Sequence, residues 1–222
     1  HLAITCERMG NLYLQDQQNE QALEVIRKAH TVKLSVSEKH ENGPKDLSFS
    51  YSKLGDVYIK LGRTAEAYDM YGKSLNIRKQ LAEEKPQDGE MQRAYTVGLN
   101  RVADVLLELH RDAEALELCE TSLQRRMDLA TSQPDNTQAK MDLGVGHFKR
   151  AQVLARMGRL DEALPAFESA RVILNGMADA LKKSNSEVNA WVDDSNDKLA
   201  YIESTCAICH SRHSTDPICH LY

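Results

Sequence analysis

The residues best suited to chemistry lie together near the end of this 222-residue sequence. Three cysteines and three histidines fall within residues 205–222, namely Cys206, Cys209, His210, His213, Cys219 and His220. Thiolate and imidazole groups are good ligands for transition metals, and cysteine thiols also form covalent bonds to cofactors. The cluster therefore predicts a cofactor or metal site in a short tail.

Cys206, Cys209 and His210 have the spacing Cys-x2-Cys-His, in which two thiols lie one helical turn apart beside an imidazole. The segment resembles the haem attachment motif of c-type cytochromes. The resemblance implies haem c bound through Cys206 and Cys209, with His210 as the proximal iron ligand. His220 is the candidate for the sixth ligand within the tail, and His1 of a neighbouring copy is the candidate if copies stack head to tail.

Two alternatives remain open for the same tail. Cys206, Cys209, His213 and Cys219 form a thiolate and imidazole set whose spacing is close to that of a zinc knuckle, although the knuckle's glycines are missing. The other alternative is an inert tail, because termini beyond the last packed helix are often loose.

The elements that must position this tail are repeated. A small residue recurs with spacings of 45, 48 and 48 residues, at Gly10, Gly55, Ala103 and Ala151. Twelve positions after each of these comes an alanine, at Ala22, Ala67, Ala115 and Ala163. A third position keeps the same spacings, at Ala29, Ser74, Ser122 and Ala170. Three positions that share one period indicate a repeat protein, in which each unit packs on its neighbours.

The second repeat carries the pattern most completely, at Tyr51, Leu54, Gly55, Tyr58, Ala67, Tyr71 and Ser74. This pattern resembles the tetratricopeptide repeat (TPR), a pair of antiparallel helices whose usual period is 34 residues. The longer period here implies longer second helices. The resemblance implies an all-α fold: a right-handed superhelical solenoid of four helix-turn-helix repeats, followed by a capping helix and the Cys/His-rich tail.

The domain organisation follows from the same pattern. We expect the solenoid over residues 1–204 and the tail over residues 205–222. The repeats are predicted at about residues 3–45, 46–92, 93–140 and 141–188, and the capping helix at residues 189–204. Because the sequence begins at His1 rather than at Met, we expect either a processed chain or a segment of a longer protein.

Four residues have predicted structural roles within the repeats. Cys6 and Cys119 fall at packing positions, so we expect them to be plain core thiols. Thr64 and Asp161 precede the second helices of repeats two and four, where their side chains are predicted to act as N-caps.

The TPR resemblance also implies a groove, lined by the first helices, that receives protein or peptide partners. The corresponding residues are Asn11, Ser52, Asp56, Asn100, Asp104, Phe148 and Gln152. Glu7 stands where chaperone-tail binders place the first lysine of their carboxylate clamp, so such a clamp is not expected. The candidates for holding an acidic ligand are Lys53, Arg101, Lys149 and Arg156.

Composition and motifs exclude several functions. The net charge of −5 argues against nucleic acid binding, and no apolar stretch approaches the length of a membrane span. No phosphate-binding glycine loop, nucleophile elbow or zinc-protease helix is present, so we expect no enzyme.

The sequence therefore predicts a protein-interaction scaffold that carries haem c and transfers electrons through self-assembly or to a docked partner. Haem c attachment occurs outside the cytoplasm, which implies the periplasm or the cell exterior. The alternative is a haem-free TPR adaptor for protein or peptide partners, cytoplasmic, with a zinc-binding or inert tail.

Overall fold

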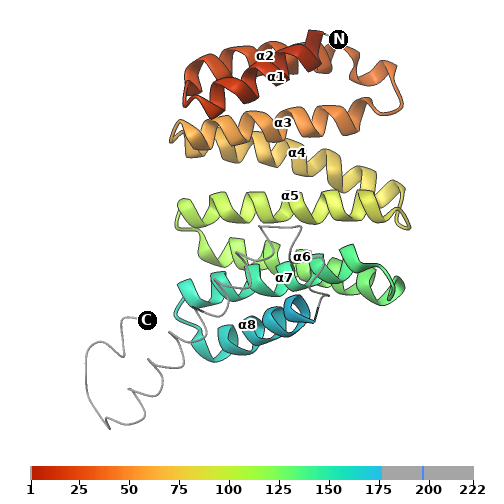
Figure 1. The fold of residues 1–222 in the computed structure, drawn as a ribbon, viewed down its shortest axis with the longest axis vertical. Helices are drawn as coiled ribbons and strands as arrows, with labels where there is room; N and C mark the ends of the chain where they lie inside the picture. Colours follow the sequence, from red (N-terminus) through yellow and green to blue (C-terminus); the bar gives the residue numbers. More distant parts are fainter. Residues whose placement is uncertain (1, 177–196, 198–222) are drawn as a thin grey trace, which may run out of the picture. The chain divides into compact units, whose positions relative to one another are not determined.

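The computed structural model describes residues 2–176 and Asp197. His1, the predicted capping helix apart from Asp197, and the Cys/His-rich tail lie outside the described residues. The described part contains eight α-helices and one 3-10 helix (Figure 1): α1 (Leu2–Gln15), α2 (Asn19–Val36), η1 (Ser37–Lys39), α3 (Gly43–Lys60), α4 (Thr64–Glu84), α5 (Gly89–Glu108), α6 (Asp112–Ser132), α7 (Thr137–Arg156) and α8 (Leu160–Asn175). The predicted all-α class is confirmed.

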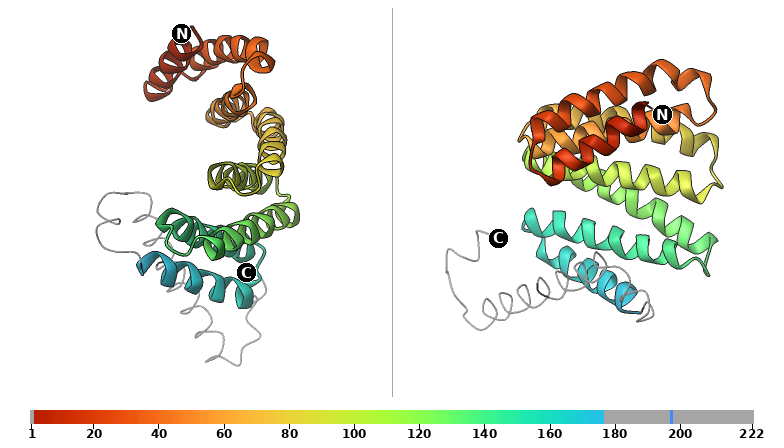
Figure 2. Two further views of the ribbon diagram at one scale, coloured as in Figure 1. Left: turned by 90° about the vertical axis from the view of Figure 1, so that its right-hand side faces the viewer. Right: turned by 45° about the horizontal axis from the view of Figure 1, so that its top comes forward.

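The chain divides into two compact units. Unit 1 (His1–Arg111) contains α1 to α5, and unit 2 (Asp112–Tyr222) contains α6 to α8. In unit 1, α1 packs on α2 and α3 on α4, while α2 also packs on α3 and α4 on α5. Figure 2 shows α3 and α5 on one side of unit 1 and α4 on the other. In unit 2, α7 packs on both α6 and α8.

A left-handed residue closes each of the four turns that follow a first helix. These residues are Gln17, Gly62, His110 and Gly158, with φ between 57° and 73°. In each turn the next N–H returns to the carbonyl five residues earlier, at 2.8 to 2.9 Å. This closure satisfies carbonyls at the end of the helix and terminates it. Glycine adopts the required backbone without strain, yet two of the four turns use another residue.

The N-cap predictions for Thr64 and Asp161 are wrong. Arg63 and Arg159 hold the N-cap positions of α4 and α8, and neither side chain caps its helix. Each arginine instead forms a 2.6 Å ion pair with the glutamate three residues later. The sequence pattern placed each cap too late, because Thr64 is already the first residue of α4 and Asp161 the second residue of α8.

Small residues at the repeat positions allow the paired helices within each unit to approach closely. The four recurring alanines are fully buried, and a side-chain carbon at Gly55 would lie 2.6 Å from the Tyr71 ring. Cys6 and Cys119 are buried thiols, as the repeat pattern predicts. Among the helices that are described, none combines the length and apolar character needed to cross a membrane.

Candidate functional site

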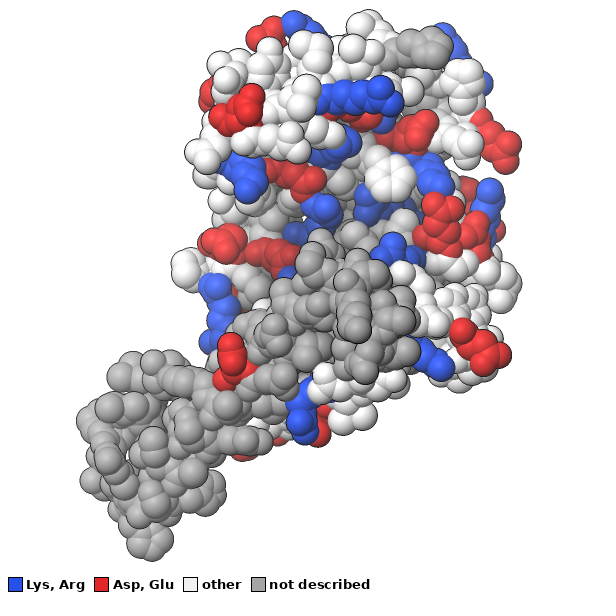
Figure 3. Space-filling view, in the orientation of Figure 1, with Lys and Arg blue, Asp and Glu red and all other residues white. Residues whose placement is uncertain are grey.

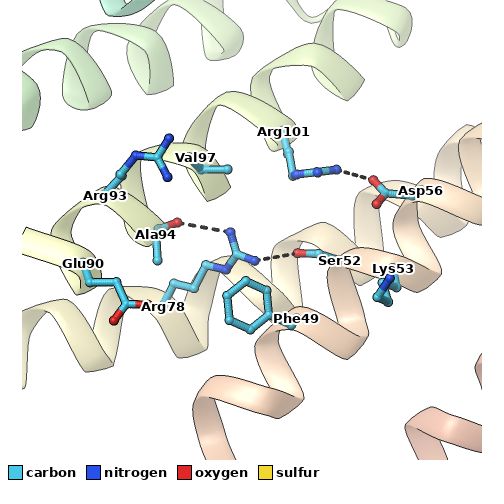
Figure 4. Close-up of a pocket in the computed structure, with 10 residues that line it drawn as sticks. All are labelled: Phe49, Ser52, Lys53, Asp56, Arg78, Glu90, Arg93, Ala94, Val97 and Arg101. Atoms are coloured by element: carbon cyan, nitrogen blue, oxygen red, sulfur yellow. Dashed lines mark hydrogen bonds and ion pairs between the residues drawn. The ribbon is translucent and has the colours of Figure 1, made fainter. Parts of the chain in front are cut away.

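A cavity of about 320 Å³ opens between α3, α4 and α5 in unit 1 (Figure 4). Its lining contains four cationic and two acidic side chains, together with Phe49, Ser52, Ala94 and Val97. The cations are Lys53, Arg78, Arg93 and Arg101, and the acids are Asp56 and Glu90. We call this cavity the Arg78 pocket.

A chain of hydrogen bonds fixes the floor of the Arg78 pocket. The Ser74 hydroxyl donates to the Ser48 carbonyl at 2.7 Å, so the Ser52 hydroxyl donates to Ser74 Oγ at 2.9 Å. Ser52 Oγ in turn accepts a bond from Arg78 Nη2 at 3.0 Å. Each hydroxyl both donates and accepts, which strengthens the chain and orients the Arg78 guanidinium.

Arg78 is a buried cation without a carboxylate partner within the described part of the chain. Its side chain is 4% exposed, and Nη1 donates to the Ala94 carbonyl at 3.1 Å. The guanidinium carbon lies 5.2 Å from the centre of the Phe49 ring, and Nε has no hydrogen-bond partner among the described residues. Burial, and then the charge of Arg101, lower the pKa of Arg78 to about 10. Arg78 therefore remains charged at neutral pH, although its partners are uncharged.

Arg101 lines both the Arg78 pocket and a second cavity of about 380 Å³. Arg101 forms an ion pair with Asp56, whose Oδ1 also accepts a 2.6 Å bond from the Tyr71 hydroxyl. Burial, followed by the hydrogen bond to Asp56, raises the pKa of Tyr71 well above its usual value. The second cavity is lined by Ile59, Gly62, Thr64, Tyr71, Arg101, Asp104, Val105 and Glu108.

Of the other charged side chains in the Arg78 pocket, some pair with an opposite charge and others have a neutral partner. Glu90 pairs with Lys45 at 2.7 Å, which offsets its charge. Lys53 Nζ donates to the neutral Asn11 Oδ1 at 3.1 Å. Asp56 and Glu90 are thus each paired with a cation, while Lys53 and Arg78 have neutral partners in the described part. In the space-filling view, Lys and Arg side chains interspersed with acidic ones surround a hollow in the middle of unit 1 (Figure 3).

The structure brings several of the predicted groove residues of unit 1 together. Ser52 and Asp56 line the Arg78 pocket, and Asp104 lines the second cavity. Asn11 accepts a hydrogen bond from Lys53. Asn100 is buried, and its Oδ1 has no hydrogen-bond partner among the described residues.

The two groove residues predicted in unit 2 have different surroundings. Phe148 is 2% exposed and packs edge to face on Phe167, with ring centres 5.8 Å apart. Gln152 is half-buried. Phe148 therefore has almost no surface to offer a partner. Of the cations predicted to hold an acidic ligand, Lys53 and Arg101 both line the Arg78 pocket.

Six residues of the pocket were not predicted from the sequence: Phe49, Arg78, Glu90, Arg93, Ala94 and Val97. Arg78 lies on α4, a second helix, whereas the TPR resemblance points to the first helices. A signal was present nonetheless, because an arginine stands four positions after both Ser74 and Ser122, at Arg78 and Arg126. A cation that recurs at a buried repeat position indicates a shared structural bond.

The predicted cofactor residues of the tail lie outside the described residues. These are Cys206, Cys209, His210, His213, Cys219 and His220, together with His1. Within residues 2–176 and at Asp197, no three His, Cys, Asp or Glu side chains gather in a way that could hold a metal ion.

Comparisons with known proteins agree with this architecture. The tetratricopeptide repeat family model matches residues 50–85, which cover most of α3 and all of α4. The fold is TPR-like. The apo form of RapI is 15% identical with a TM-score of 0.68 over 91% of this chain and 48% of RapI, so this chain spans about half of that protein. BtubC (BKLC) from P. vanneervenii is 15% identical with a TM-score of 0.60 over 89% of this chain and 78% of BtubC. No curated protein matches the sequence.

Proposed function

We propose that this chain is a protein-interaction scaffold and that unit 1 binds an acidic segment of a partner protein between α3 and α5. The observation that carries the proposal is the Arg78 pocket, where a buried cation and Lys53 have no carboxylate partner within the described residues. Buried charges are normally paired, because an unpaired charge is costly to remove from water. A carboxylate or other anion on a partner would supply the missing charge.

The lining also suits a polypeptide. Phe49 is 42% exposed at the rim, and Val97 adds a second apolar wall. Apolar walls around a few fixed polar groups are typical of ligand sites, in which the polar groups determine orientation. The second cavity continues along the same helices through Arg101, so a partner segment can contact both.

A screen of randomised peptides against the full chain tests this proposal. Peptides of about 12 residues that bind should be enriched in Asp and Glu, and binding should weaken with added salt because paired charges are screened. The double variant Lys53→Gln/Arg78→Met, with its fold checked by thermal unfolding, should lose the acidic enrichment. Lys79→Gln is the matched control, since it removes an exposed cation of α4 that does not line the pocket.

Either of two results would contradict the proposal. One is a bound pool without acidic bias. The other is acidic binding that the double variant retains, because the anion would then bind elsewhere.

We propose separately, from the motif Cys206-x2-Cys209-His210, that the tail carries haem c with His210 as proximal ligand, which would place the protein outside the cytoplasm. His220, or His1 of a neighbouring copy in a head-to-tail stack, is the proposed sixth ligand. In this form the scaffold would transfer electrons between copies or to a partner. The alternative is a haem-free cytoplasmic adaptor whose tail is inert or holds zinc through Cys206, Cys209, His213 and Cys219.

The visible spectrum and intact mass of protein from its natural host decide between these forms of the tail. A Soret band and the added mass of one haem support haem c, and both should be lost on deletion of residues 205–222. A colourless protein of unmodified mass rules haem out, and zinc analysis then separates the remaining two.

A further inference from the structure

Two arginines occupy the same repeat position in the two units and make the same bond. Arg78 in unit 1 and Arg126 in unit 2 are each 4% exposed. Each donates from Nη1 to the carbonyl sixteen residues later, Ala94 at 3.1 Å and Asp142 at 2.7 Å. A glycine twenty residues later packs on each arginine's Cδ, in α5 and α7 respectively. The bond is therefore a recurrent structural element.

The residue that accepts this bond differs between the units. In unit 2 it is Asp142, a buried aspartate whose backbone carbonyl accepts the bond from Arg126 and whose carboxylate accepts a 2.9 Å bond from the Gln138 amide. In unit 1 it is Ala94, which has no charge. Unit 1 therefore has the same buried cation with an alanine at the acceptor position, and both residues line the Arg78 pocket.

The charge balance of the pocket indicates how much negative charge a ligand should bring. Asp56 pairs with Arg101 and Glu90 with Lys45, whereas Arg78 and Lys53 have neutral partners in the described part. Arg78 and Lys53 thus carry two positive charges that these two pairs do not neutralise, and Arg93 is a further cation of the lining. A carboxylate carries one negative charge, while a phosphoryl group carries about 1.5 to 2 at pH 7 and has three acceptor oxygens. Arginine also binds phosphoryl oxygens with strong charge-assisted hydrogen bonds.

We propose that the Arg78 pocket binds the phosphoryl group of a phosphorylated side chain on the partner segment. This inference rests on the proposed function and specifies the acidic group that the scaffold recognises. The phosphoryl group supplies negative charge at Arg78, whose hydrogen-bond partners are uncharged. Lys53 provides the second cation, and Phe49 packs against the aliphatic part of the ligand.

Three peptide libraries test the inference with the full chain. They are identical except for a fixed central residue, which is phosphoserine, Glu or Ser. The phosphoserine library should bind about tenfold more tightly than the Glu library, because its charge and number of acceptors are greater. The Ser library should bind least, and inorganic phosphate should compete with the phosphoserine library.

Ala94→Asp is the sharpest variant because it gives unit 1 the residue that unit 2 already has. It should abolish the preference for phosphoserine while the thermal unfolding midpoint stays the same or rises. Arg78→Met should also abolish binding but could act by weakening the fold. Arg126→Met removes the same structural bond in unit 2, so it is the matched control and should keep phosphoserine binding.

The outcomes separate this inference from the proposed function. If the Glu library binds as tightly as the phosphoserine library, the scaffold proposal stands and the phosphoryl inference is wrong. If folded Ala94→Asp still prefers phosphoserine, the phosphoryl group binds elsewhere and the inference is again wrong. If no library binds the wild-type chain, both proposals fail.

Discussion

The hairpins α3/α4 and α7/α8 share one repeat pattern, but the side chains between the helices are mostly polar in α3/α4 and mostly apolar in α7/α8. Six positions of α3/α4 carry mostly polar side chains: Ser48, Ser52, Asp56, Tyr71, Ser74 and Arg78. The residues 96 positions later in α7/α8 are Gly144, Phe148, Gln152, Phe167, Ala170 and Leu174. One hairpin is held by a chain of hydrogen bonds, and the other by the Phe148–Phe167 contact and by Leu174 against Gly144.

The difference separates what the fold requires from what it permits. Both hairpins are closely packed, so the repeat needs side chains of suitable volume and does not need polar groups. Replacement of buried polar or ionic groups by well-packed apolar ones is often neutral or stabilising. The polar interior of α3/α4 therefore exceeds the demands of folding, which favours a role in binding.

The largest effect is expected where Gly55 of α3 packs against the Tyr71 ring of α4. Gly55→Ala places a carbon 2.6 Å from the Tyr71 ring, and this ring is held by its bond to Asp56. We expect a loss of about 2 kcal/mol in the free energy of unfolding, measured by urea denaturation. Gly72→Ala is the control in α4, where the new carbon meets no atom within 4 Å and a gain of about 0.5–1 kcal/mol is expected. Equal changes in unfolding free energy at the two sites would show that contact with Tyr71 does not exclude a larger side chain at position 55.

The next effect concerns the hydrogen-bond chain that α7/α8 lacks. Ser52→Ala leaves Arg78 Nη2 without its acceptor in a buried site, so a loss of about 1–2 kcal/mol is expected by urea denaturation. The triple variant Ser52→Ala/Ser74→Ala/Arg78→Leu removes the three bonded side chains together. Its free energy of unfolding should be closer to that of the wild type than the value for Ser52→Ala. It should also lose binding of acidic peptides. A triple variant much less stable than Ser52→Ala would mean that the polar chain is required for folding.

A smaller loss of stability is expected when Tyr71 is replaced by phenylalanine, the residue at the equivalent position 167 of α8. Tyr71→Phe removes the bond to Asp56 and should cost about 1 kcal/mol at pH 7. Because the pKa of Tyr71 is raised in the folded protein, its stabilising contribution is complete below pH of about 10 and declines as the pH rises further. The difference in unfolding free energy between wild type and variant should therefore narrow above about pH 10. A constant difference from pH 7 to pH 11 would contradict the raised pKa.

The smallest effect is expected at the turns that close the hairpins. Gln17 has a φ of 59° where α3/α4 and α7/α8 use Gly62 and Gly158. Gln17→Gly should raise the free energy of unfolding by about 0.5–1 kcal/mol, because glycine adopts this backbone without strain. Gly62→Ala introduces the strain in α3/α4 and should lower the stability by a similar amount. Thermal unfolding of both variants checks the pair, and a destabilised Gln17→Gly would refute the assignment of strain.

Much of the fold could be predicted from the sequence, because the same packing problem recurs along it. The recurring alanines and glycines identify the helix contacts, and Cys6 and Cys119 are buried where the register places them. The candidate site was only partly predictable. Ser52 and Asp56 were found through the TPR resemblance, but the same resemblance pointed to Phe148, which is buried against Phe167.

The sequence by itself determined the period, the all-α class and the small residues at the helix contacts, because these depend on spacing along the chain and on side-chain size. The tertiary structure decided which charges are neutralised. Arg78, Arg101 and Lys53 are similar cations in the sequence, yet Arg101 lies against Asp56 while Arg78 lies among a hydroxyl, a carbonyl and an aromatic ring. Whether a buried charge is compensated depends on the distances between groups on different helices, and only the packing of α3, α4 and α5 sets these distances.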